Sequence, residues 1–328
     1  MDLPFEFPAF RPRPPWWGAD LQTLRNVLSP PRVDLSRYRA HRLKLPLADG
    51  SGDALSALVQ EPEDSRRPLV VLIHGLSGSE DSAYMVASAA HLLGRGHPVL
   101  RLNLRGAGPS RSICRFQYHA GRSEDLRDAL ESLDSRLKRR GLLLVGYSLG
   151  GNMLLKFLAE YAPAFPVHAG ASVSAPIDLA AASLRFLAPR NRLYHRHVLR
   201  NMKRESLASG AETSDAERRC IRAARSIYEF DATFVAPRNG YASAEDYYAD
   251  NMASRFLDRV RVPTLLIHSL DDPWIPAAIY ANYPWQKNRG LHPLLVEGGG
   301  HVGFHARDSD VAWHDRALGS FFENFASA

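Results

Sequence analysis

Short, uninterrupted runs of apolar residues constrain the fold of this chain more than any other feature of its sequence. Three of them are PLVVLI at 68–73, GLLLV at 141–145 and VPTLLIH at 262–268. A run of this length without alternation between apolar and polar residues is typical of a strand buried on both faces of a parallel sheet. Further runs predict three more strands, at residues 99–104, 168–173 and 291–296. Alternating patterns predict a hairpin before them, at residues 42–47 and 54–60.

Helical patterns separate the predicted strands. They cover residues 83–93, 123–139 and 149–161. Strands and helices in alternation predict the α/β class, with a mostly parallel, doubly wound sheet. The alternation stops after Pro176, and residues 178–255 show mainly helical patterns. The simplest interpretation is a helical cap inserted at the carboxyl edge of the sheet, where such folds bind their ligands.

A chain of 328 residues fits one α/β core with an insertion. We expect an N-terminal arm at 1–39, an α/β core made of 40–176 and 256–328, and the cap at 177–255. Prolines recur through the arm and predict little regular structure there. Its aromatic residues either touch a membrane surface or pack on the core as a clasp, and the lack of a helical amphipathic period favours the clasp. They are Phe5, Phe7, Phe10, Trp16 and Trp17.

Composition excludes several classes of function. The net charge is +6 and the pI about 9.4, but the basic residues are spread over predicted helix ends and faces, so we expect no nucleic-acid partner. Two cysteines without a CxxC or Cys/His cluster predict no metal site and a reducing compartment. No dinucleotide or phosphate fingerprint is present, so we expect no cofactor. Without a signal-peptide pattern or an apolar stretch of about 20 residues, we expect a cytoplasmic protein.

One turn between a predicted strand and a predicted helix carries a nucleophile pattern. The segment Gly146-Tyr147-Ser148-Leu149-Gly150 fits G-x-S-x-G and lies between the run GLLLV and the helix at 149–161. Glycines let neighbouring backbone approach such a strained turn, which leaves the serine hydroxyl exposed at the helix N-terminus. Amide groups there favour developing negative charge. Ser148 is therefore the predicted nucleophile.

A serine nucleophile needs a base and a carboxylate that orients the base, and the chain order in this type of fold is Ser, then Asp or Glu, then His. Asp271 and Asp272 follow the strand at 262–268, and spacing alone does not choose between them. His301 follows three glycines, which predict a flexible loop that can place its ring over Ser148.

An acyl-transfer reaction also needs two preorganised donors for the oxyanion. We expect these to be the backbone amides of Leu149, directly after Ser148, and of Leu76, in the loop that follows the strand at 68–73. His74 begins that loop, and its position in the chain does not fit the order of a triad. We expect His74 to stabilise the loop by a hydrogen bond.

With these motifs, residues 40–325 resemble the α/β-hydrolase superfamily, and more specifically its YheT-like branch, the AB hydrolase 4 family. The supporting segments are Leu21-Gln22-Thr23-Leu24, His74 to Ser79, Asn103-Leu104-Arg105-Gly106, Tyr118-His119-Ala120-Gly121 with Asp125, Gly146 to Asn152, Phe230-Asp231 with Tyr247-Tyr248, and Asp271-Asp272-Pro273. The resemblance implies that Asp272, directly before the proline, is the triad acid. It also implies hydrolysis of carboxylic esters, lipid esters among them. One departure is Asp20, where the family usually has histidine before Leu-Gln-Thr.

The leading hypothesis is a carboxylic ester hydrolase that acts on small-molecule or lipid esters through an acyl-enzyme. A thioesterase, amidase or peptidase would use the same triad. A non-catalytic binding protein on this fold typically lacks a triad member, and here all three are present. Eight large side chains could line an acyl pocket, or simply pack the cap on the core. They are Leu184, Phe186, Leu187, Tyr194, Ile227, Tyr228, Phe230 and Trp274.

Overall fold

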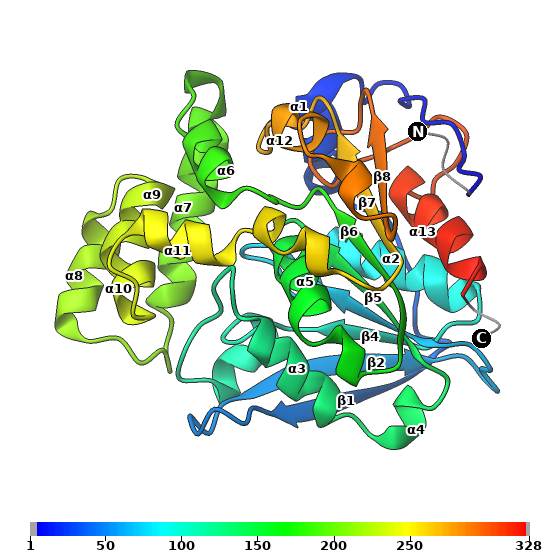
Figure 1. The fold of residues 1–328 in the computed structure, drawn as a ribbon, viewed down its shortest axis with the longest axis horizontal. Coiled ribbons are helices and arrows are strands. Elements are labelled where there is room, and N and C mark those ends of the chain that lie inside the picture. Colours follow the sequence, from blue (N-terminus) through cyan, green and yellow to red (C-terminus); the bar gives the residue numbers. More distant parts are fainter. Residues whose placement is uncertain (1–4, 326–328) are drawn as a thin grey trace.

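The structure is a computed structural model that describes residues 5–325, and one eight-stranded sheet forms its centre (Figure 1). The strands are ordered β1-β2-β4-β3-β5-β6-β7-β8. β2 pairs antiparallel with β1 and β4, and all the other neighbours are parallel. This confirms the predicted α/β fold with a mostly parallel sheet. The strands are β1 (Arg39–Pro46), β2 (Ala54–Glu61), β3 (Leu69–Ile73), β4 (Val99–Leu102), β5 (Leu142–Tyr147), β6 (Val167–Val173), β7 (Thr264–Ser269) and β8 (Leu291–Val296).

Helices cover both faces of the sheet. The apolar runs make this possible, because successive side chains of β3 point to opposite faces and every one of them is buried. On one face Val70 and Leu72 pack with α2 and α13, and on the other Val71 packs with α3 and α5. The helices are α1 (Gly18–Leu28), α2 (Ala83–Gly94), α3 (Ser123–Glu131), α4 (Ser135–Lys138), α5 (Leu149–Glu160), α6 (Leu179–Phe186), α7 (Arg192–Ser206), α8 (Asp215–Ala223), α9 (Ile227–Phe230), α10 (Ala236–Arg238), α11 (Ala244–Asn251), α12 (Ala277–Ala281) and α13 (Trp313–Glu323).

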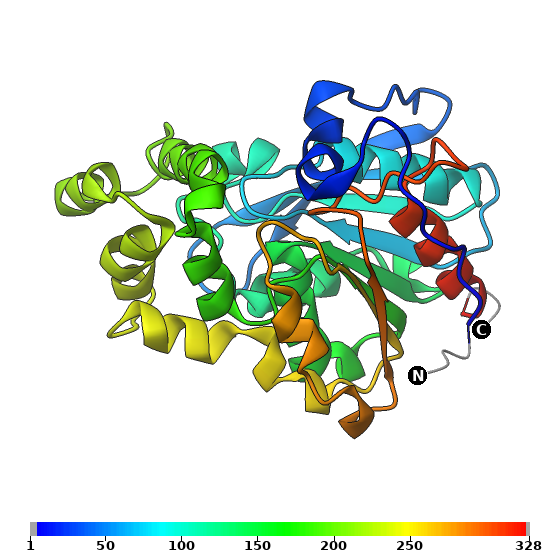
Figure 2. The same cartoon turned by 90° about the horizontal axis from the view of Figure 1, so that it is seen from above.

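Helices α6–α11 occupy the stretch between β6 and β7 and project from one end of the sheet (Figures 1 and 2). A five-residue π-helical turn, Asp231–Val235, separates α9 from α10. Turns of this kind are rare and occur frequently at functional sites. The boundaries proposed above for the cap, 177–255, stay a prediction.

Two predictions of secondary structure are wrong. The arm contains a three-turn helix, α1, because no proline lies between Pro15 and Pro30. The helix predicted at 123–139 is broken into α3 and α4, and Asp134 caps the second helix by accepting a hydrogen bond from the amide of Arg136. The leucines at helical spacing stay buried on both sides of the break, which is why the periodicity conceals it.

The first part of the arm packs on the core. The ring of Phe5 lies edge-on to Phe321, with centroids 5.0 Å apart, and Phe10 meets Trp313 at 5.6 Å. The indole nitrogen of Trp313 donates to the carbonyl of Pro8 at 2.6 Å. Phe5 and Phe10 therefore pack on the core as a clasp, which is one of the two arrangements considered above for the aromatic residues of the arm. Trp17, at the start of α1, is different, since 58% of it is exposed.

A buried arginine ties the β1–β2 hairpin to α3. Arg105 is 1% exposed and donates two hydrogen bonds to the carboxylate of Asp125, at 3.0 and 2.7 Å. The same guanidinium lies 2.8 Å from Asp49 and 3.4 Å from Asp53, which flank the turn of the hairpin. A planar donor fork fits this ring of carboxylates better than a lysine would.

Replacing Arg105 by alanine should lower the free energy of unfolding by about 3–5 kcal/mol, because it removes the nearest counter-charge of the buried carboxylates Asp53 and Asp125. The measurement is the midpoint of urea unfolding at unchanged slope. Arg136 provides a matched control, since it pairs with Glu61 at 2.8 Å on the surface. Arg136→Ala should cost about 1 kcal/mol or less. Equal losses in the two variants would contradict the structural role given to Arg105.

Candidate active site

Ser148 sits in a strained turn between β5 and α5. Its backbone has φ +49° and ψ −122°, a conformation that a residue with a side chain rarely adopts. The turn is held on both sides. The Ser148 amide donates to the carbonyl of Val173 at 2.8 Å, and the Ser148 carbonyl accepts from the amide of Gly151 at 2.8 Å. The strain is therefore compensated by the sheet and by the first turn of the helix.

This turn requires glycines because neighbouring backbone atoms lie where a side chain would otherwise be. A Cβ on Gly150 would lie 2.3 Å from the carbonyl oxygen of His74, and one on Gly146 would lie 2.4 Å from the carbonyl oxygen of Gly150. Gly75 is equally constrained, because its Cβ would lie 2.9 Å from the Cβ of Ser148. The loop after β3 and the start of α5 can therefore meet at Ser148 only without side chains at these positions.

The structure brings His301 and Asp272 together with Ser148. The Nε2 atom of His301 lies 2.9 Å from Ser148 Oγ, and its Nδ1 atom lies 2.8 Å from an oxygen of Asp272. Because a carboxylate can only accept, Nδ1 carries the proton and Nε2 is free to accept from the serine hydroxyl. The second oxygen of Asp272 accepts from the amides of Trp274 and Ile275, at 2.8 and 3.0 Å.

Asp272 is fully buried and yet ionised. Burial acts to raise the pKa of this carboxyl. The electrostatic interaction and hydrogen bond with His301, the electrostatic interaction with His268 and the Trp274 amide outweigh burial, so the pKa lies below its usual value. A permanent carboxylate behind the imidazole favours the tautomer in which Nε2 is the acceptor.

The neighbouring Asp271 has a different contact. Its carboxylate accepts from the amide of Gly300 at 2.9 Å and from the hydroxyl of Ser269. Asp271 therefore anchors the loop that carries His301, while Asp272 touches the histidine itself. Spacing along the chain could not separate these two contacts.

Helix α1 supplies contacts that the sequence analysis missed. The hydroxyl of Thr23 accepts from the backbone amide of His301 at 2.9 Å. Gln22 is buried, and its side-chain oxygen accepts from the amide of His305 at 2.7 Å while its amide nitrogen donates to the carbonyl of His305 at 3.1 Å. The only sequence signal for these residues was the segment Leu21-Gln22-Thr23 in the resemblance.

The contacts with α1 explain glycines on both sides of His301. A Cβ on Gly300 would lie 2.4 Å from the carbonyl oxygen of Ala19, and one on Gly303 would lie 2.4 Å from that of Gln22. The sequence analysis predicted a flexible loop here. The structure instead shows a loop pressed against α1, in which glycine serves close packing.

The backbone amides of Leu76 and Leu149, close to Ser148, have no acceptor among the described residues. The amides on either side of Leu76 are occupied, because Gly75 donates to the hydroxyl of Tyr84 at 2.9 Å and Ser77 to that of Tyr118 at 2.7 Å. The tyrosines thus hold the loop while leaving the Leu76 amide available.

His74 stabilises the same loop. Its Nδ1 atom donates to the carbonyl of Gly75 at 2.7 Å, and its Nε2 atom accepts from the amide of Leu104 at 3.1 Å. Burial lowers the pKa of His74 to about 4, so the ring is neutral and able to make both bonds. Among residues 5–325, the His74 ring makes no hydrogen bond to Ser148.

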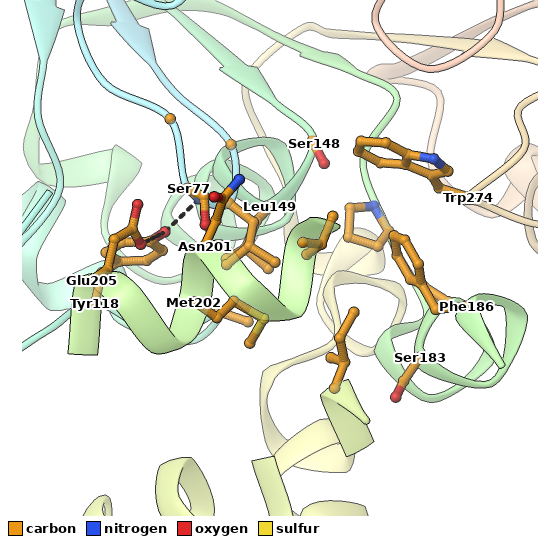
Figure 3. A pocket seen from close by; sticks show the side chains of 18 of the residues that line it. Ser77, Tyr118, Ser148, Leu149, Ser183, Phe186, Asn201, Met202, Glu205 and Trp274 are labelled. Atoms are coloured by element: carbon orange, nitrogen blue, oxygen red, sulfur yellow. Dashed lines mark hydrogen bonds between the residues drawn. The ribbon is translucent and has the colours of Figure 1, made fainter. Parts of the chain in front are cut away.

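A cavity of about 440 Å³ lies between Ser148 and helices α6–α11. Figure 3 shows Trp274 and Phe186 on one side of Ser148, and Tyr118 and Glu205 on the other. Four of the eight predicted pocket residues line this cavity, namely Phe186, Ile227, Phe230 and Trp274. The other four do not line it, namely Leu184, Leu187, Tyr194 and Tyr228.

The Trp274 ring also touches His301. Its centroid lies 4.2 Å from that of the His301 imidazole. The apolar ring shields the imidazole from water and limits its rotation. Phe186 and Tyr194 pack on Trp274 in turn, at 5.5 and 5.4 Å, so helices α6 and α7 support the histidine indirectly.

Two carboxyl groups line the cavity. Glu205 of α7 accepts from the Tyr118 hydroxyl at 3.3 Å, and Asp231 accepts from the Tyr248 hydroxyl at 2.7 Å. Burial raises the pKa of each to about 7. Both groups can therefore take up a proton near neutral pH, and a protonated carboxyl is also a hydrogen-bond donor.

Within residues 5–325, no three His, Cys, Asp or Glu side chains are grouped so that they could hold a metal ion. The helices in this range are also too short or too polar to cross a membrane.

Residues 68–308 match the family described as alpha/beta hydrolase fold. The chain belongs to this family. YheT of Escherichia coli (strain K12), whose name carries an esterase assignment, is 33% identical over 287 residues, which cover 87% of this α/β hydrolase and 83% of YheT. This similarity confirms the resemblance to the YheT-like branch, and the chain is an enzyme of the hydrolase class.

Other relatives of this α/β hydrolase have names that include lipid substrates. The monoacylglycerol lipase of Saccharomyces cerevisiae is 26% identical over 273 residues, which cover 80% of this chain and 60% of the lipase. The phospholipase ABHD3 of Homo sapiens is 27% identical over 297 residues, or 88% of this chain and 71% of the phospholipase. Among solved structures, the Pyrococcus furiosus esterase Pf2001 aligns with a TM-score of 0.60 and 18% identity, over 90% of this chain and 97% of the esterase. At that identity the likeness concerns the fold.

The raised pKa of Asp231 predicts a pH-dependent stability. The pKa of this carboxyl rises from 3.8 to about 7 on folding, so its protonated form stabilises the folded state. This contribution is complete below pH 3.8 and is lost as the pH rises through about 7. Asp231→Asn keeps an acceptor for Tyr248 and does not ionise. The variant should therefore gain stability relative to wild type across that range, by up to about 1.4 kcal/mol per pH unit.

Thermal unfolding at a series of pH values measures this difference. Asp250→Asn is the control, because Asp250 is exposed on the nearby helix α11, and its pH dependence should match that of wild type. A constant offset between Asp231→Asn and wild type at every pH would show that Asp231 is not protonated on folding.

Proposed function

We propose that this hydrolase cleaves carboxylic esters with Ser148 as nucleophile, His301 as general base and Asp272 as the carboxylate that orients the base. The observation that carries the proposal is the continuous line of hydrogen bonds from Ser148 Oγ to His301 Nε2, at 2.9 Å, and from His301 Nδ1 to Asp272, at 2.8 Å. The line ends at the wall of a cavity, so the serine oxygen can meet a substrate. These contacts and their chain order meet the geometric requirements of a serine hydrolase.

The reaction would proceed in two halves. Ser148 Oγ attacks the ester carbonyl carbon while His301 Nε2 takes its proton, and Asp272 stabilises the imidazolium that forms. The tetrahedral intermediate collapses when His301 returns the proton to the departing alcohol, which leaves an acyl group on Ser148. A water molecule then attacks the acyl carbon while His301 takes its proton. The second tetrahedral intermediate collapses when His301 gives this proton to Ser148 Oγ, and the carboxylic acid is released.

The amides of Leu76 and Leu149 would stabilise the oxyanion in both halves. Each has no other acceptor in the described residues and each adjoins the nucleophile, so both are free to donate where negative charge develops. Preorganised donors of this kind typically contribute about 10²–10³ in rate each. Ser148 lines the same cavity as Leu76 and Leu149.

Lipid esters are the substrate class that we propose. The wall formed by Phe186, Ile227 and Phe230 would receive an acyl chain, because it is apolar and lies beside Ser148. The names of the yeast monoacylglycerol lipase and of the phospholipase ABHD3 support the same class. Ester, thioester and amide substrates share the triad chemistry, so a substrate panel decides among them.

Labelling with a fluorophosphonate tests the nucleophile. Wild-type protein should be labelled and Ser148→Ala should not, because the probe bonds to an activated serine oxygen. Activity on p-nitrophenyl esters of increasing chain length should be lost in the same variant. Well-folded wild type that neither labels nor turns over any ester would overturn the proposal and favour a binding protein.

The contact of Thr23 with His301 predicts that this threonine of the cavity wall affects the rate by holding the base. Thr23→Val removes the acceptor for the His301 amide and should lower kcat by about 10- to 100-fold with little change in KM, since the loss of one buried hydrogen bond misplaces the base. Thr23→Ser keeps the hydroxyl and should retain most of the activity. Equal KM and kcat in Thr23→Val and wild type would show that the base is positioned without Thr23.

A further inference from the structure

Exposed apolar side chains are concentrated in two segments of this protein. Among residues 5–325, eight large apolar residues are strongly exposed, and seven of them belong to α1 with its preceding residue or to the corner between α6 and α7. The seven are Trp17, Leu21, Val27, Leu28, Leu184, Leu187 and Leu193, with exposed fractions between 42% and 81%. Single exposed leucines are normal on a protein surface, whereas a cluster marks an interaction site.

The two segments touch each other. The carboxylate of Asp20 in α1 pairs with Arg190 at 3.0 Å and accepts from the hydroxyl of Tyr194 at 3.0 Å. Figure 1 shows α1 and α6 on the same side of the molecule. We call the seven apolar residues together the rim, because Val27 also lines the cavity that leads to Ser148. His197, one turn after Leu193 on α7, lines the cavity as well and is exposed.

The rim is bordered by positive charge. Residues 184–204 include seven arginine and lysine residues and no aspartate or glutamate. Four arginines of α7 are exposed and have no carboxylate within 4 Å among the described residues, namely Arg192, Arg196, Arg200 and Arg204. Leu193, Arg196 and Arg200 recur at helical spacing, so apolar and cationic side chains share one face of α7.

We propose that the rim docks on the surface of a phospholipid bilayer that carries anionic headgroups. Leucine and tryptophan side chains enter the boundary between headgroups and acyl chains, and arginines beside them bind the phosphates. A nucleic acid would match the arginines but would leave the exposed leucines against a charged backbone. Docking in this orientation would turn the mouth of the cavity toward the bilayer. That consequence for substrate entry rests on the proposed function, whereas docking itself does not.

Co-sedimentation with vesicles tests the surface without catalysis. Full-length Ser148→Ala protein is mixed with vesicles of phosphatidylcholine alone, or with part of it replaced by phosphatidylglycerol. We expect binding to the phosphatidylglycerol vesicles, weakened by salt, and much less binding to pure phosphatidylcholine. No binding to either vesicle by protein that is folded would overturn the proposal.

Matched variants locate the surface. Arg192→Glu with Arg196→Glu should weaken binding by about tenfold or more, while Arg139→Glu with Arg140→Glu changes the net charge equally, away from the rim, and should bind nearly as wild type. Leu193→Asn should weaken binding by about tenfold and Leu193→Phe should retain it. Equal effects of the two arginine pairs would mean that net charge alone drives association, which contradicts a rim site.

Two further measurements separate this proposal from its alternatives. In protein that retains Ser148, each variant should hydrolyse a soluble short-chain p-nitrophenyl ester as wild type does. Such activity would show that the substitutions leave the site intact. Vesicle binding by protein that hydrolyses no ester would contradict the proposed function but support the docking surface. Binding of a single-stranded RNA oligonucleotide that competes with vesicles and survives Leu193→Asn would overturn the bilayer in favour of nucleic acid.

Discussion

The strained backbone of Ser148 is the constraint on which the rest of the site depends. A positive φ at a residue with a side chain is unfavourable, and the turn persists because the sheet and helix α5 hold it from both sides. The same turn requires the loop after β3 to approach within a distance that permits no Cβ at Gly75 or Gly150. Once this approach is made, the serine oxygen, the free amides and the start of α5 face one cavity. The site is thus a consequence of backbone sterics before any side chain contributes chemistry.

The loop of His301 is held from three directions. Asp271 anchors it through Gly300, Thr23 accepts from the amide of His301, and Gln22 binds His305 on the far side. Two of these anchors come from the N-terminal arm, nearly the whole chain away from the loop. In the mechanism that we propose, the His301 imidazole must meet both Asp272 and the Ser148 hydroxyl. Such support matters there because small displacements of a base are costly in rate. The arm is therefore part of the site's framework as well as a clasp on the core.

Helix α7 is a two-sided element. Its inward face carries Val198 and Met202 toward the cavity, together with Glu205, whose pKa is raised by burial. Its outward face carries Leu193 beside four exposed arginines that have no carboxylate within 4 Å among the described residues. One exposed leucine on a surface helix is normal, but Leu193 belongs to the seven exposed apolar residues of the rim. Helix α7 therefore connects the wall of the cavity to the docking surface that we propose.

The sequence by itself determined the class of fold and the candidate residues Ser148 and His301, because both depend on local rules. Unbroken apolar runs report burial on both faces of a sheet, and glycines around a serine report a turn that only glycine can form. It also showed a carboxylate pair at the correct place in the chain, and the resemblance singled out Asp272. What only the tertiary structure decided depends on contacts between distant segments. The contact of Asp271 with Gly300, the contact of Thr23 with His301 and the outward direction of Leu184 and Leu187 all follow from how helices lie against the sheet. Periodicity and composition describe an element's own faces, and they carry no information on which partner each face will meet.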